Sequence, residues 1–133
     1  MKLEKKGETM SYKTHKGEYY ITCFRKNMGS NYFFQKIKGT IFEVEDENGA
    51  VWKFGIGKDK YTHYRITDIA SGMGVTSWHD RKKDVMWEFE RREKTILERL
   101  NNAMNSDNRY RKFVLELEKI YASEKERGVQ YDV

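Results

Sequence analysis

The sequence predicts an α+β protein in which an antiparallel sheet of about five to six strands is followed by two C-terminal helices. Three observations lead to this fold class. Apolar and polar residues alternate over much of positions 18–78, apolar residues recur every three to four positions over 80–122, and the chain contains no proline, so Gly, Asn and Asp make the turns. Strands grouped before helices are typical of an antiparallel sheet with its helices on one face or end.

Length and composition indicate a single domain, residues 1–133. A chain of 133 residues can bury a modest core without metals or disulfides, and a 14% aromatic content argues against disorder. The sequence shows no secretory signal and no apolar run of membrane-spanning length. We therefore expect a cytoplasmic protein with no membrane partner.

The two ends of the chain lack periodicity. Residues 1–17 predict a basic flexible arm, and residues 123–133 predict a charged tail. Between them, the first strand is expected to begin at Glu18, and residues 32–37 are expected to return beside it after a turn at 27–31.

The clearest local structure is a hairpin over residues 40–56, around the turn at 47–49. A two-residue loop would mix acidic and aromatic side chains on one face. A three-residue loop with Gly49 in the left-handed conformation avoids this mixture and sets Glu43 opposite Lys53. We therefore predict the three-residue loop, with the apolar pairs Val44–Trp52 and Phe42–Phe54.

A second hairpin is expected from residues 63–69 and 73–78 across Ala70-Ser71-Gly72. The segment before it, Gly55 to Asp59, lacks the spacing of a phosphate-binding P-loop, and we interpret it as a flexible turn. The alternation of the hairpin sends one set of side chains to the core and places two others, Arg65 and Thr67, on the opposite face; the core set is Tyr64, Ile66, Met73 and Val75.

The period then changes to that of amphipathic helices. One helix is predicted from Arg81 to Met104, and a second follows an Asp107 cap, with its apolar stripe at Tyr110, Phe113, Val114, Leu117 and Tyr121. In the first helix Trp87 broadens the stripe formed by Met86 and Phe89. A stripe that a small sheet cannot cover favours a homodimer.

Both helices begin with an aspartate followed by cations. Asp80 and Asp107 suit the N-cap position, but cations in the first turn oppose the partial positive charge of a helix N-terminus. Backbone N–H groups flanked by cations suit a bound anion, although a solvated surface would also explain them. The cations are Arg81, Lys82 and Lys83 in the first helix and Arg109, Arg111 and Lys112 in the second.

Aromatic and basic residues near the first helix supply further candidates. Tyr61, His63 and Arg65 alternate along one strand, and Trp78 and His79 directly precede Asp80 and the cations of the first helix. Such a set could bind a ligand, with donors for a phosphate and aromatic rings for stacking. The alternative is that these residues form an ordinary solvated face of the sheet.

Metal and catalytic signatures are not evident. His15, His63, His79 and Cys23 lack the short paired spacing of a zinc site, so no metal and no cofactor is expected. Cys23 lies in an apolar strand and is interpreted as an inert core thiol, and Ser71 does not occupy a nucleophile elbow. We expect a protein that is not an enzyme.

The segment from Arg65 to Met73, together with the two cationic helix starts, resembles small accessory proteins of bacteriophages. Within that group the architecture of residues 18–122 is similar to that of the Thoeris anti-defence sponges. The resemblance implies a phage anti-defence protein that holds a host nucleotide signal without cleaving it.

A formal net charge of +5 and a sequence pI of about 9.2 favour an anionic partner. The expected function is non-catalytic binding of a phosphate-bearing ligand, most simply a nucleotide. A nucleic-acid-binding module and a protein inhibitor of a host factor remain as alternatives.

Overall fold

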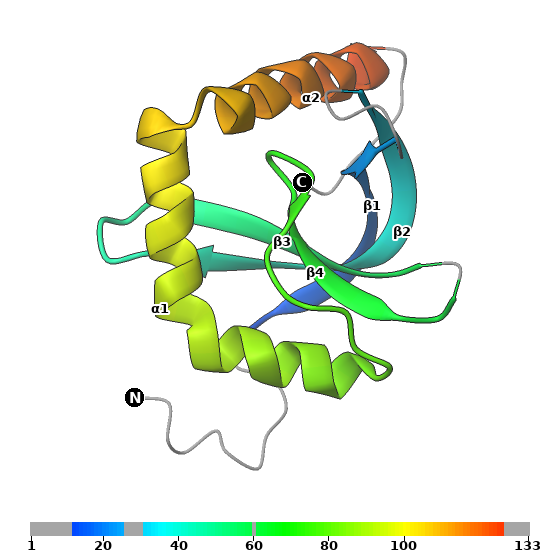
Figure 1. Ribbon diagram of the computed structural model, residues 1–133, viewed down its shortest axis with the longest axis vertical. Coiled ribbons are helices and arrows are strands. Elements are labelled where there is room, and N and C mark those ends of the chain that lie inside the picture. The colour runs from blue at the N-terminus through cyan, green and yellow to red at the C-terminus, as the bar shows by residue number, and fades with distance from the viewer. Residues whose placement is uncertain (1–11, 26–30, 60, 127–133) are drawn as a thin grey trace.

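The computed structural model describes residues 12–25, 31–59 and 61–126. Five antiparallel strands, neighbours in chain order, precede two helices (Figure 1), which confirms the predicted α+β class. The strands are β1 (Thr14–Phe24), β2 (Tyr32–Glu45), β3 (Val51–Lys58), β4 (Tyr64–Asp68) and β5 (Met73–Gly74), and the helices are α1 (Lys82–Ser106) and α2 (Asn108–Glu126).

Several element boundaries differ from the prediction. The expected flexible arm is already strand at Thr14, which pairs with Phe42, while residues 1–11 lie outside the described residues. The two strands expected at 32–37 and 40–45 are one strand, because Gly39 continues the pairing, with Gly17 of β1 on one side and Gly57 of β3 on the other. At the other end α2 continues to Glu126, so the first part of the expected charged tail is helical.

The predicted register of the central hairpin is confirmed. Its pairs are Val44–Trp52 and Phe42–Phe54, and the Glu43 carboxylate lies 3.9 Å from the Lys53 ammonium on the other face. Gly49 has a φ of 86°, in the left-handed region, and its N–H donates to the Asp46 carbonyl over 3.1 Å.

Two predictions about the later strands are wrong. Gly55 and Gly57 lie within β3 rather than in a turn. The last strand ends at Gly74 instead of Trp78. In a regular ladder the Ile66 N–H would donate to a backbone carbonyl, but here it donates to the Thr76 hydroxyl over 3.0 Å, so the backbone pairing does not continue.

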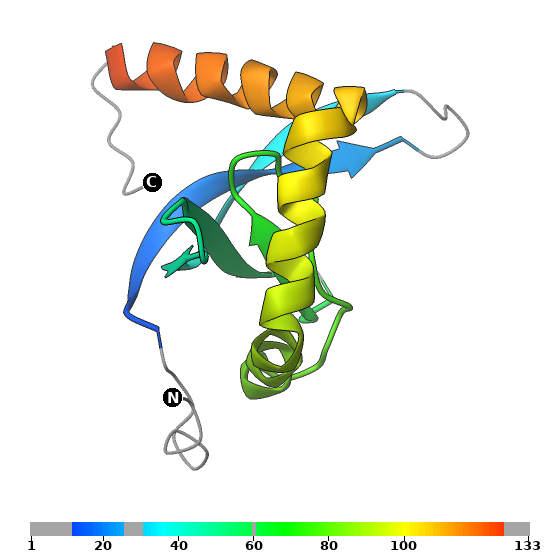
Figure 2. The same cartoon turned by 90° about the vertical axis from the view of Figure 1, so that its left-hand side faces the viewer.

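One face of the sheet, called here the outer face, carries the main core beneath α1. Phe42 and Phe54 stack with ring centroids 5.5 Å apart, and Phe89 of α1 meets both edge-on at 5.2 and 4.9 Å. Figures 1 and 2 show α1 running along this side and α2 extending from its end. Trp87 points away from this core and is 58% exposed.

The opposite face, called here the inner face, is closed by the curl of the sheet. The Thr22 N–H donates to the Gly72 carbonyl over 2.9 Å, so the edge of β1 meets the turn between β4 and β5. The Tyr19 ring crosses β2 and rests on Gly55, where a Cβ atom would lie 2.3 Å from the ring. Thr67, expected on an open face, is buried by this curl.

Candidate binding site

The inner face opens into a hollow of about 620 Å³. It lies within the 300–1,000 Å³ range typical of small-molecule sites. Its lining comes from all five strands and the loops around them: Ile21, Thr22, Cys23, Phe24, Gln35, Ile37, Gly57, Lys58, Asp59, Tyr61, Arg65, Thr67, Gly72, Gly74 and Trp78. The curl of the sheet therefore places three predicted site residues, Tyr61, Arg65 and Trp78, around one cavity.

Arg65 is the central cation of the hollow. It extends from the inner face of β4 and lies against Gly74, where a Cβ atom would come within 2.1 Å of its Nε. That Nε donates to the Thr76 carbonyl over 3.2 Å, and the guanidinium carbon lies 5.0 Å from the centre of the Trp78 ring. Glycine at position 74 thus makes room for the guanidinium.

The electrostatic environment of Arg65 is unusual for a half-buried cation. Within the part of the chain that the structure describes, no carboxylate forms an ion pair with it. Burial alone lowers the pKa of its guanidinium from the ordinary value. Burying a charge is costly unless it is paired, so this guanidinium is suited to pairing with a bound anion.

A fixed loop carries Tyr61 to the rim. The Asp59 carboxylate accepts the N–H groups of Tyr61 and His63, both at 2.8 Å, and Thr62 adopts a φ of 67°. The hydrogen bond from the His63 N–H is the main reason that the pKa of Asp59 is lowered. Tyr61 is 65% exposed and Trp78 is 46% exposed, so both rings present stacking surface to solvent.

The two histidines do not line the hollow. His63 lies between two carboxylates, with Nδ1 3.7 Å from Asp59 and Nε2 3.2 Å from Asp80. His79 Nε2 contacts the buried Glu88 carboxylate at 2.6 Å. Both therefore hold loops in place rather than face the cavity.

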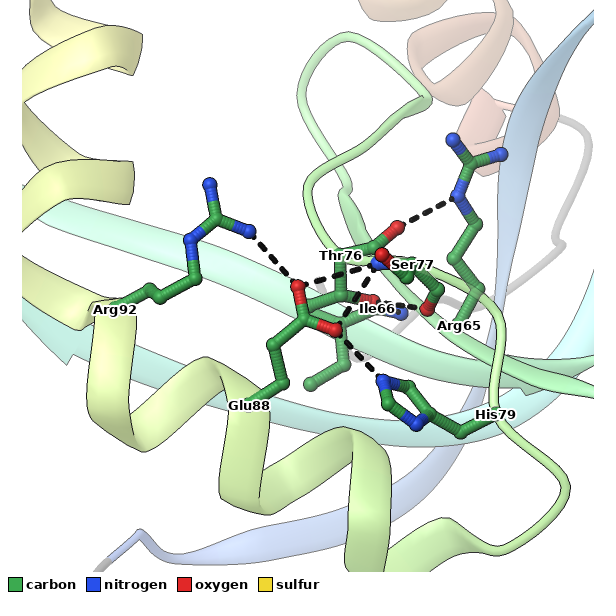
Figure 3. Close-up of polar contacts among 7 residues, drawn as sticks. All are labelled: Arg65, Ile66, Thr76, Ser77, His79, Glu88 and Arg92. Atoms are coloured by element: carbon green, nitrogen blue, oxygen red, sulfur yellow. Dashed lines mark hydrogen bonds and ion pairs between the residues drawn. The ribbon is translucent and has the colours of Figure 1, made fainter.

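Glu88 anchors the loop that carries Trp78. Its carboxylate accepts the Ser77 N–H at 3.2 Å and the Arg92 guanidinium at 2.8 Å, besides the contact with His79. Burial by itself would raise the pKa of Glu88, but these hydrogen bonds outweigh it and leave the pKa lowered. Figure 3 shows Arg65 on the other side of this loop, with its guanidinium directed away from Glu88.

The start of α1 differs from the prediction. Asp80 does not cap this helix, because its carboxylate pairs with His63; Arg81 occupies the cap position without a side-chain hydrogen bond. Asp84 then balances Arg81, whose Nε donates to it over 3.0 Å. Lys82 donates to the Thr40 hydroxyl over 2.8 Å, and Lys83 is exposed. None of these cations lines the hollow.

The start of α2 agrees with the predicted cap. The Asp107 carboxylate accepts the N–H groups of Arg109 and Tyr110 at 2.9 and 3.1 Å. Arg111 donates to the carbonyls of Met104 and Asn105 at the end of α1, at 3.2 and 2.8 Å, and thereby joins the two helices. Its cationic group therefore has a structural partner.

Arg109 connects α2 to the hollow through an aromatic ring. Its guanidinium carbon lies 4.5 Å from the centre of the Phe24 ring, and Phe24 lines the hollow. Lys112 lies 5.5 Å from the Tyr32 ring. The cations at the start of α1 lie at the far end of that helix (Figure 1), so the structure does not bring the two cationic helix starts together within one chain.

Sequence reasoning missed the polar residues on β1 and β2 and the glycines of the hollow. Cys23 was expected in the core, but it is only partly buried, lines the hollow and lies 3.6 Å from the amide oxygen of Gln35. Burial raises the pKa of the Cys23 thiol. Glycine within a strand marks a close approach of another group. Gly55, which lies against the Tyr19 ring, and Gly57, which lines the hollow, alternate along β3 and were the sequence signal for this face.

Among the described residues, no group of three or more histidine, cysteine or acidic side chains is arranged to hold a metal ion. None of the helices in that part of the chain is long and apolar enough to cross a membrane. No protein-family model matches the sequence, and neither curated proteins nor solved structures give a significant match.

Proposed function

We propose that the protein binds a phosphate-bearing small molecule, most simply a nucleotide, in the hollow of the inner face and does not convert it. The observation that carries this proposal is the guanidinium of Arg65. It is half-buried in the hollow, stacked on Trp78, and has no carboxylate partner among the described residues.

The geometry of Arg65 suits a phosphate group. Its Nε is engaged by the Thr76 carbonyl, which fixes the plane of the guanidinium, and the terminal nitrogens have no acceptor among the described residues. Paired N–H donors in one plane match two phosphate oxygens. Lys58 also lines the hollow, but its ammonium lies over the Tyr64 ring at 5.7 Å, so Arg65 is the cation that carries the site.

The aromatic rim suits a nucleobase. The exposed rings of Trp78 and Tyr61 border the same hollow as Arg65. Stacking of one base on an aromatic side chain contributes about 1–3 kcal/mol. A ligand with a planar ring and a phosphate would use both features together.

The one thiol among the lining residues does not favour nucleophilic turnover of a ligand. The cavity residues include one thiol, Cys23, whose pKa is raised by burial and which therefore forms the reactive thiolate less readily. The resemblance to anti-defence sponges adds the role of sequestering a signal nucleotide in the cytoplasm, and it alone supports that part of the proposal.

The test compares adenosine 5′-monophosphate with adenosine, two probes that differ only in the phosphate. Isothermal titration should show saturable binding of the nucleotide by the native protein and at least about tenfold weaker binding of the nucleoside, as expected for the loss of charged hydrogen bonds. Equal binding of the two probes, or binding of neither by the native protein, would refute the proposed site for this nucleotide.

Three variants locate the site. Arg65→Gln should remove the preference for phosphate, and Gly74→Ala should weaken binding because its Cβ displaces the guanidinium. Lys83→Ala, an exposed position at the start of α1, is the matched control and should leave binding unchanged. An unaltered affinity in Arg65→Gln would show that the hollow is not the site.

A nucleic-acid-binding role is a second candidate, supported by one cluster. Where the end of β1 pairs with the start of β2, cations lie over aromatic rings in a form suited to a single strand of nucleic acid. The pairs are Arg25 with Phe33 at 4.8 Å, Arg109 with Phe24 at 4.5 Å and Lys112 with Tyr32 at 5.5 Å. An oligonucleotide that used this cluster would lose affinity steeply with salt, roughly a thousandfold between about 50 and 200 mM for several phosphate contacts.

We also propose a homodimer, based on Trp87. This exposed indole lies on α1 beneath the guanidinium of Arg91, at 4.1 Å. Large exposed aromatic rings are typical centres of interfaces. Light scattering at micromolar concentration should report a dimer that Trp87→Glu weakens; a monomer for the native protein would refute it.

A further inference from the structure

A second cavity, of about 300 Å³, lies where α1 and α2 meet beside β5. Figure 2 shows the two helices meeting at an angle. The volume is at the lower end of the range typical of small-molecule sites. The lining consists of Met73, Gly74, Val75, Arg92, Ile96, Arg99, Leu100, Ala103, Asp107, Arg109, Tyr110 and Phe113. We call this cavity the helix-elbow groove.

The apolar part of the helix-elbow groove is mainly aliphatic. Val75 and Ala103 pack against the main core and remain only partly buried. The two aromatic residues of the lining, Tyr110 and Phe113, are 5% and 1% exposed. They present little ring surface for stacking, unlike the exposed rings at the rim of the hollow. The groove therefore suits a hydrocarbon body better than a nucleobase.

The charged part of the lining is mainly cationic. Arg92 donates to the Glu88 carboxylate over 2.8 Å, so its charge is balanced. Arg99 of α1 and Arg109 of α2 are exposed, and neither forms an ion pair with a carboxylate of the described residues. The one carboxylate among the lining residues, that of Asp107, accepts two N–H groups of α2. Two guanidinium groups are thus left for an anion.

Each unpaired arginine lies beside an apolar residue of the same lining. Arg99 precedes Ala103 by four positions, which places both on one face of α1. The guanidinium carbon of Arg109 lies 5.7 Å from the centre of the Phe113 ring. A ligand that joins an anionic group to an apolar body would gain charged hydrogen bonds and burial of apolar area in one place.

We propose that the helix-elbow groove binds a small apolar carboxylic acid, with its carboxylate paired to Arg99 and Arg109 and its hydrocarbon body against Val75 and Ala103. Guanidinium groups match the two oxygens of a carboxylate. This site is separate from the phosphate site, because Gly74 is the one lining residue that the two cavities share. Its failure would leave the proposed function untouched.

The test uses 3-phenylpropionate and 3-phenylpropan-1-ol, which have the same ring and chain length but differ in charge. Chemical-shift titration of the native protein should give saturable binding of the acid, at least about tenfold tighter than that of the alcohol, as expected for charged hydrogen bonds. The amide signals of Val75 and Ala103 should move. Equal affinities, no saturable binding of the acid, or shifts confined to the hollow would overturn the proposal.

Two variants with matched charge changes give an independent readout. The double replacement Arg99→Gln and Arg109→Gln should abolish the discrimination between acid and alcohol, and it should fold because both side chains are exposed. Lys94→Gln removes an exposed cation of α1 that does not line the groove, and should leave the affinity unchanged. Discrimination retained in the double variant, or an equal loss in Lys94→Gln, would refute this site.

Discussion

The outer and inner faces of the sheet use the same strands for opposite purposes. On β3, Phe54 faces outward into the aromatic core beneath α1, whereas the next residue, Gly55, faces inward and leaves room for the Tyr19 ring. On β4, the outward Ile66 is fully buried and the inward Arg65 is half-buried in the hollow. Helices cover one face, while curl and glycines shape the other.

Within a single strand, therefore, the outward residues contribute to stability and the inward residues shape the candidate binding site. Residues on the outer face gain free energy from burial of large apolar area. The inner face keeps a cavity and a cation that packing alone would not favour. Substitutions on neighbouring residues should therefore have different consequences.

The largest expected effect is at Phe54. Phe54→Ala should lower the free energy of unfolding by about 3–5 kcal/mol, because it removes a fully buried ring from the stack with Phe42 and Phe89. Gly55→Ala should lower it by about 1–3 kcal/mol, through overpacking against Tyr19. Urea denaturation measures both.

The matched control is Lys53→Ala, which should change stability by less than about 0.5 kcal/mol because its ion pair with Glu43 is exposed. Equal effects at positions 53, 54 and 55 would remove the distinction between the two faces.

A smaller effect is expected at Glu88, which links the faces by holding the loop between Arg65 and α1. Glu88→Ala should lower stability by about 1.5–3 kcal/mol through loss of hydrogen bonds to a buried charge. Because the folded pKa of Glu88 is lowered, its contribution is present above the unfolded pKa and is lost as pH falls through the folded pKa.

Thermal unfolding from pH 7 toward pH 3 checks this sign. The native protein should lose stability on acidification more steeply than Glu88→Ala does. Parallel curves for the two proteins would mean that the carboxylate is not stabilised by its partners.

The stability of α2 should depend on its N-terminal cap, Asp107. Asp107→Ala should cost about 0.5–2 kcal/mol, because two N–H groups of α2 lose their acceptor. Asp80→Ala should cost less than about 0.5 kcal/mol, since Asp80 is exposed and caps no helix. Similar losses in the two variants would contradict the difference between the helix starts.

The last prediction concerns the pH dependence of stability at the buried Asp68, whose sign is opposite to that of Glu88. The folded pKa of Asp68 is raised by burial, so the folded state holds its proton more tightly and stability falls as pH rises from the unfolded pKa to the folded one. Asp68→Asn cannot titrate and should show a flatter profile over that range. An unchanged profile would indicate that Asp68 does not titrate there.

Local chemistry in the sequence determined much of this protein. Alternation along the strands and the Gly49 turn fixed the pairing of Phe42 with Phe54, since a one-residue slip would expose both rings. The Asp107 cap was equally readable, because a cap depends on a carboxylate and N–H groups within three residues.

Tertiary structure decided the features that depend on distant partners. Asp80 matches the same cap pattern as Asp107, yet His63, from the loop before β4, takes its carboxylate. The glycines of β3 suggested a turn until the ring of Tyr19 came to rest on them. Sequence alternation placed Arg65 on the face opposite the core, but only the curl of the sheet brought Trp78 and Tyr61 around it. Local patterns specify backbone conformation, whereas a cavity requires segments far apart in the chain to meet, and no local pattern encodes their distance.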